Sequence, residues 1–88
     1  MHEASLMIGL MRQIETIARQ EKAERVTKVT VWCGALSHMT EAHFAEHFEQ
    51  AAKGTLAEGA TLDVTISDDL TADHAQDVLL ESIDVVDD

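Results

Sequence analysis

The first three residues, Met1, His2 and Glu3, carry groups that together can hold a metal ion. The α-amine of Met1, the amide nitrogen of His2 and its imidazole close a five-membered and then a six-membered ring around one ion. The remaining in-plane position is open to the Glu3 amide or to another nitrogen or oxygen. Planar, nitrogen-rich coordination suits Ni(II) or Cu(II), and the amine loses its proton near neutral pH when a metal competes for it. The alternative is a histidine that stands at position two by chance.

A second candidate is the pair His43 and His47, four residues apart in the segment 40–53. If that segment is helical, both rings lie on one face, which is the spacing of a helical metal pair. The sequence fixes no third ligand nearby, so two solvated histidines on an exposed helix face are the alternative. His38 and His74 fall in a turn and a loop, where we expect them to be exposed.

Charge and composition exclude several classes of function. The 88 residues contain 17 acidic and 6 basic side chains, for a net charge of −11. Nucleic acids and anionic membranes bind through Lys and Arg, so neither is an expected partner. The chain has no glycine-rich phosphate loop, no GxSxG and no HExxH motif, and we expect no enzymatic activity.

Cysteine and hydropathy point to a cytoplasmic location. Cys33 is the only cysteine, so neither an internal disulfide nor a CxxC site is available. A reducing compartment is the simplest interpretation. No apolar run approaches the length of a membrane span, and Glu3 stands where a signal peptide carries positive charge.

The helices that would carry these residues are predicted from apolar spacing. Segment 5–22 repeats apolar residues every three or four positions, with Ser5 as the expected N-cap and methionines as core filler. The stripe consists of Leu6, Met7, Leu10, Met11, Ile14, Ile17 and Ala18. Segment 40–53 is a second helix, capped by Thr40 and apolar along Phe44 and Phe48.

Three strands are expected beside these helices. Segment 26–33 alternates, with Val29, Val31 and Cys33 on the core face. Segment 61–66 alternates likewise, with Leu62, Val64 and Ile66 inward. An acidic loop, 67–77, precedes a strand around 80–86. The predicted fold class is α/β, a two-layer sandwich with two amphipathic helices on one face of a small three-stranded sheet.

Four segments taken in order resemble the HypA/HybF family of hydrogenase nickel-incorporation proteins. They are "MHEASL" (1–6), "RVTKVTVWCGALSHM" (25–39), "KGTLAEGATLDV" (53–64) and "ESIDV" (81–85). The resemblance implies delivery of Ni(II) to maturing [NiFe]-hydrogenase, and in some organisms to urease, together with a GTPase partner. It places the nickel on the Met1 amine, the His2 amide and imidazole, and the Glu3 amide.

The chain departs from this family at the zinc domain. Members of the family carry two CxxC pairs before the closing strand, whereas this chain has only the loop 67–77 at that place. We therefore expect residues 1–88 to form a single HypA-like nickel-binding domain without structural zinc. The alternative to a metallochaperone is a metal-independent interaction or assembly module that keeps this fold, pairing through its sheet edges with a partner or in a homodimer.

Overall fold

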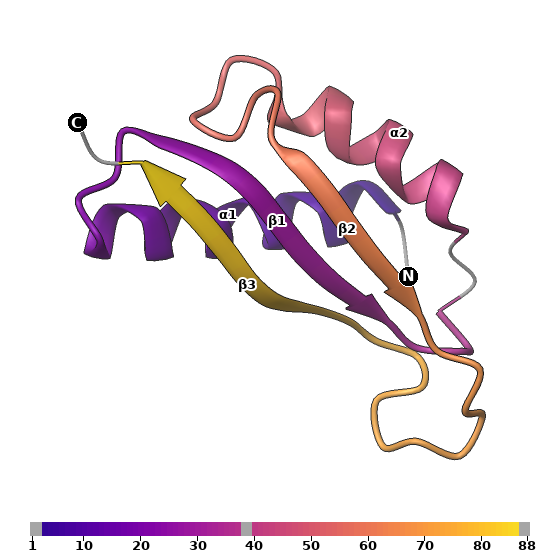
Figure 1. The fold of residues 1–88 in the computed structure, drawn as a ribbon. Helices are drawn as coiled ribbons and strands as arrows, with labels where there is room; N and C mark the ends of the chain where they lie inside the picture. Colours follow the sequence, from indigo (N-terminus) through magenta and orange to yellow (C-terminus); the bar gives the residue numbers. More distant parts are fainter. Residues whose placement is uncertain (1–2, 38–39, 87–88) are drawn as a thin grey trace.

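The computed structural model describes residues 3–37 and 40–86, and Figure 1 traces them through two helices and three strands. The elements follow the order α1 (Glu3–Gln20), β1 (Arg25–Cys33), α2 (Glu41–Ala52), β2 (Thr61–Ile66) and β3 (Val78–Val86). Within the described residues, no helix combines the length and apolar character that crossing a membrane requires.

β1 is the central strand of a sheet with the order β2-β1-β3. It pairs with β2 in parallel, with Val31 opposite Val64. The parallel pair needs a crossover connection, which α2 supplies. The pairing of β1 with β3 is antiparallel and places Cys33 opposite Val78, so β3 begins two residues before the predicted start at 80.

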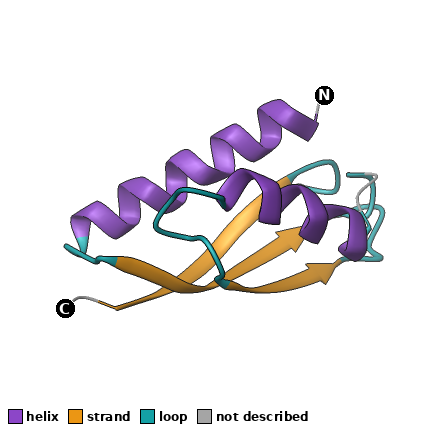
Figure 2. Ribbon diagram, turned by 90° about the horizontal axis from the view of Figure 1, so that it is seen from above, coloured by secondary structure: helices purple, strands orange, loops and turns teal. Residues whose placement is uncertain are grey.

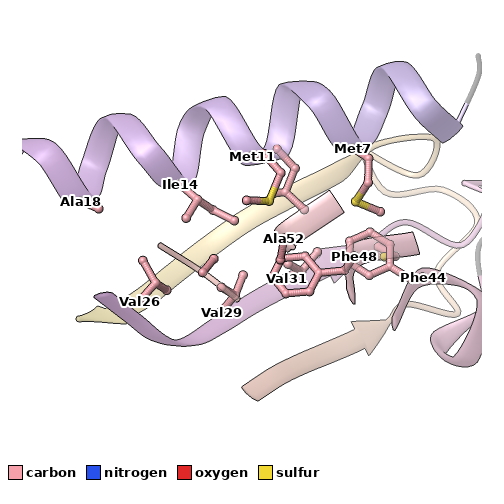
Figure 3. Packing of buried hydrophobic residues seen from close by; sticks show 13 residues of the cluster. Met7, Met11, Ile14, Ala18, Val26, Val29, Val31, Phe44, Phe48 and Ala52 are labelled. Carbon is pink, nitrogen blue, oxygen red and sulfur yellow. The ribbon is translucent and has the colours of Figure 1, made fainter. Parts of the chain in front are cut away.

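Both helices lie on the same face of the sheet, as the view from above shows (Figure 2). One hydrophobic cluster joins the two layers, and Figure 3 shows its packing. Its members from α1 are Met7, Leu10, Met11, Ile14 and Ala18, those from β1 are Val26, Val29, Val31 and Cys33, and those from α2 and the following turn are Phe44, Phe48, Ala52 and Ala57. The predicted two-layer sandwich is confirmed.

The start of α2 agrees with the prediction from the sequence, whereas both ends of α1 differ from it. Thr40 caps α2 as predicted, because its side chain accepts a hydrogen bond from the His43 amide at 3.2 Å. Ser5 does not cap α1, since that helix already begins at Glu3. α1 ends at Gln20, because Lys22 adopts a positive φ of 55° that a continuing helix does not allow.

Most of the predicted inward positions are buried. Val29, Val31 and Cys33 are fully enclosed, and the two methionines of α1 belong to the core as predicted. The prediction that Ile17 and Ile66 point inward is wrong, because 36% and 41% of their surfaces are exposed. Ile66 ends β2, which is an edge strand. Ile17 lies at the margin of the buried stripe of α1, whereas Ala18 in the same turn is fully buried.

Candidate metal-binding site

The proposed terminal chelate begins where α1 begins. Met1 and His2 lie outside the described residues, and Glu3 is the first residue of α1. The first amide groups of a helix have no carbonyl partner within the helix. The Glu3 nitrogen is therefore not committed to the helical ladder, which is compatible with its predicted place in the coordination plane.

The first turns of α1 border a hollow of about 430 Å³. Ser5, Leu6 and Gly9 line it from the helix, and Gln76 and Asp77 line it from the end of the loop 67–77. The end of this loop therefore lies beside the first turns of α1. In the sequence, the loop 67–77 occupies the position of the zinc domain that the resemblance predicts to be missing.

The loop 67–77 is docked on the end of β1 by backbone hydrogen bonds. The Gly34 amide donates to the Asp77 carbonyl at 2.8 Å, and the Leu36 amide donates to the Ala75 carbonyl at 2.6 Å. A Cβ atom on Gly34 would collide with the carbonyl groups of His74 and Ala75. Ala75 is 6% exposed, so the loop contributes a buried side chain despite its irregular backbone. The sequence alone does not reveal this close approach at Gly34, because His74 and Ala75 lie about 40 residues further along the chain.

Side chains inside the loop hold its conformation. The Asp69 carboxylate accepts hydrogen bonds from the backbone amide and the hydroxyl of Thr71, at 3.0 and 2.8 Å. These two bonds lower the pKa of Asp69. His74 Nδ1 lies 2.9 Å from an Asp77 carboxylate oxygen, and both side chains are more than half exposed. The expectation of an exposed His74 is confirmed, but its carboxylate partner three residues away was not anticipated. His38 lies outside the described residues.

The structure brings His43 and His47 together on α2. Their ring centroids are 4.6 Å apart and the ring planes are inclined by 35°. Among the described residues, no group of three or more His, Cys, Asp or Glu side chains is arranged to hold a metal ion. The two histidines are thus adjacent, as their spacing predicted, without a third such ligand from the described part of the chain.

Cys33 is unsuited to metal binding in the folded protein. It is fully buried in the core at the end of β1, and burial raises the pKa of its thiol. The thiolate is the form that binds metals. This agrees with the prediction that Cys33 is a small core residue.

Comparison with known proteins gives a family match over most of the chain. Residues 1–72 match the profile described as "Hydrogenase/urease nickel incorporation, metallochaperone, hypA". The hydrogenase maturation factor HypA of Dechloromonas aromatica is 38% identical over 64 residues, which cover 73% of this chain and 57% of that protein. The HypA of Archaeoglobus fulgidus is 35% identical over 66 residues, covering 75% of this chain and 60% of that protein. The chain thus matches little more than half the length of these curated relatives.

The fold of this chain is also similar to that of two solved structures. The solution structure of the Ni metallochaperone HypA from Helicobacter pylori superposes with a TM-score of 0.83 at 20% sequence identity, covering 100% of both chains. A second solution structure of a HypA protein gives a TM-score of 0.75 at 19% identity, covering 99% of this chain and 98% of the other. At such identities the likeness concerns the fold alone.

Proposed function

The chain belongs to the HypA family of hydrogenase and urease nickel-incorporation proteins, and on that premise we propose that it is a nickel metallochaperone for the maturation of a nickel enzyme. The observation that carries the proposal is the extent of the family match, which starts at residue 1 and so includes Met1, His2 and Glu3. These three residues are the proposed binding site for the nickel cargo. The client is a [NiFe]-hydrogenase or a related nickel enzyme.

The terminal segment suits a carrier because of its chemistry. Met1 contributes its amine, His2 its amide nitrogen and imidazole, and Glu3 its amide nitrogen. Three of these four donors lie within the first two residues, so the chelate forms from covalent neighbours and needs no enclosing cavity. A site at a chain terminus is open to an incoming ligand from the recipient, which permits transfer by ligand exchange.

The remaining features of the proposal concern partners and zinc. A GTPase or another nickel-enzyme maturation protein in the cytoplasm is the proposed partner, and the net charge of −11 favours an electropositive docking surface on it. No structural zinc is proposed for residues 1–88, because their single cysteine is buried in the core. The docked loop 67–77 supports treating these residues as one domain, since it ties the end of β1 to the start of β3.

The test is a calorimetric nickel titration of the protein with its native N-terminus. A matched protein carries an acetyl group on the Met1 nitrogen, which retains every side chain but removes the amine as a ligand. We expect the native protein to bind a nickel ion that the acetylated protein does not, and His2→Ala to lose the same ion. Equal nickel stoichiometry in the native and acetylated proteins would refute the terminal site.

The alternative, a metal-independent interaction module, is favoured by one observation. The sheet face opposite the helices carries Trp32, which is half-buried, and Leu79, which lies opposite it in β3 and is 38% exposed. An assembly role predicts a stoichiometric complex, with a partner or a second copy, that survives chelation of nickel. Loss of the complex on chelation would support the metallochaperone instead.

A further inference from the structure

The rotation of α2 about its axis is set by two buried phenylalanines. Phe44 is fully buried and Phe48 is 3% exposed, one helical turn apart. Figure 3 shows both rings pointing into the core beneath α1, near Met7. His43 and His47 each precede one of these rings, and successive helical residues are rotated by about 100°. The two histidines therefore share one flank of α2, beside the buried stripe.

This flank borders a hollow between the two helices. The hollow has a volume of about 530 Å³, and His47 lines it from α2 together with Gln50. Met7, Met11 and Glu15 line it from α1. His43 lies one turn nearer the start of α2, where its amide is fixed by the Thr40 hydroxyl. His43 is exposed and His47 is half-buried, so an ion from solvent can reach the pair.

We propose that His43 and His47 form a second metal site, which binds a divalent late transition metal such as Ni(II) through both imidazoles. Imidazole is a favoured ligand for Ni, Cu and Zn. Two histidines four residues apart on one helix face are a known bidentate arrangement, and the 4.6 Å separation of the ring centroids already brings these rings side by side. A small change of side-chain rotamer converts this contact into chelation.

The coordination of this site favours fast exchange. In the part of the chain that the structure describes, no third His, Cys, Asp or Glu completes a metal-binding group with the pair. With two protein ligands, the affinity is lower than that of a closed four-ligand site. Arg12 also lines the hollow, and its positive charge opposes the approach of a cation. The negative charges of Glu15, Glu46 and Glu49 on the two helices, and the net charge of −11, outweigh it.

The site lies close to the start of α1. Met7 lines the same hollow as His47, and it is four residues, or about 6 Å of helical rise, from Glu3. A role in loading the terminal chelate would rest on the proposed function. Metal binding by the histidine pair does not, because it depends only on α2 and its neighbours.

The experiment uses the full chain acetylated at the Met1 nitrogen, in which the terminal chelate is blocked, and NiCl₂ alone as the probe. Nickel bound by two imidazoles and water is six-coordinate and paramagnetic, so it broadens nearby amide signals in a ¹H–¹⁵N spectrum. We expect broadening centred on residues 43–47. We also expect the calorimetric Kd to rise about tenfold or more in His43→Ala and in His47→Ala, because the second imidazole binds intramolecularly once the first is engaged.

Two controls separate this site from general histidine binding. His74→Ala removes an exposed histidine elsewhere and should leave the Kd unchanged. The double exchange H47Q/Q50H preserves composition and charge, but separates the histidines by seven residues, or about 10 Å of helical rise, and should weaken binding as much as His47→Ala. Circular dichroism checks that each variant keeps its helical content.

The outcomes for the two metal sites are independent. If the acetylated protein binds no nickel, or binds it with broadening away from α2, the histidine pair is refuted while the terminal chelate is untouched. If His43→Ala and His47→Ala bind as the acetylated parent does, the pair is equally refuted. If the native and acetylated proteins bind the same amount of nickel, at α2 alone, the pair is supported and the terminal chelate fails.

Discussion

Replacing Gly34 with alanine tests the docking of the loop 67–77. A Cβ at this position would overlap the backbone carbonyl of Ala75 and that of His74. Backbone atoms cannot move aside as a flexible side chain can. β1 is held by partners on both sides, so we expect the loop to be displaced while the sheet persists.

The magnitude follows from the contacts that the loop would lose. The hydrogen bonds from the Gly34 and Leu36 amides contribute about 1 kcal/mol each. Exposing the methyl group of Ala75 costs about 0.8 kcal/mol more. Alanine also lowers the conformational entropy of the unfolded chain, which stabilises the folded state by about 0.4–1 kcal/mol. The free energy of unfolding should fall by about 2 kcal/mol, which leaves a typical domain folded because its total is about 5–15 kcal/mol.

The assay is equilibrium unfolding in urea, followed by circular dichroism, with hydrogen exchange of the Leu36 amide as a local readout. Gly9→Ala is the matched control, because Gly9 lies within α1 and a Cβ there meets no atom within 4 Å. That variant should gain about 0.5–1 kcal/mol from helix propensity. If Gly34→Ala is as stable as the parent and keeps the protection of the Leu36 amide, the docking of the loop is wrong.

Two further predictions concern the cap of α2 and the buried thiol. Thr40→Ala removes the hydroxyl that accepts from the His43 amide, so urea unfolding should show a loss of about 0.5–2 kcal/mol; an unchanged midpoint would contradict the cap. Because burial raises the pKa of the Cys33 thiol and encloses it, Ellman's reagent at about pH 8 should label Cys33 only in denaturant. Rapid labelling of the native protein would show that the end of β1 is open.

The elements were predictable where local patterns are strong. The Thr40 cap and the alternation of Val29, Val31 and Cys33 depend on residues that are close in sequence, and the structure confirms both. The exposure of Ile17 and Ile66 was not predictable in this way. Both residues fit an apolar repeat, but a repeat does not indicate how far the neighbouring layer extends across the face or along the length of an element.

Within the candidate sites, the sequence by itself determined the donor groups. The Met1 amine and His2 are joined covalently, and the spacing of His43 and His47 places them on one helix face wherever α2 packs. The tertiary structure decided what surrounds them. Burial of Phe44 and Phe48 turns His47 toward the hollow beside Met7, and Gly34 admits the loop that borders the start of α1. These contacts join residues far apart in the chain, so side-chain volume and layer packing determine them, and local periodicity does not.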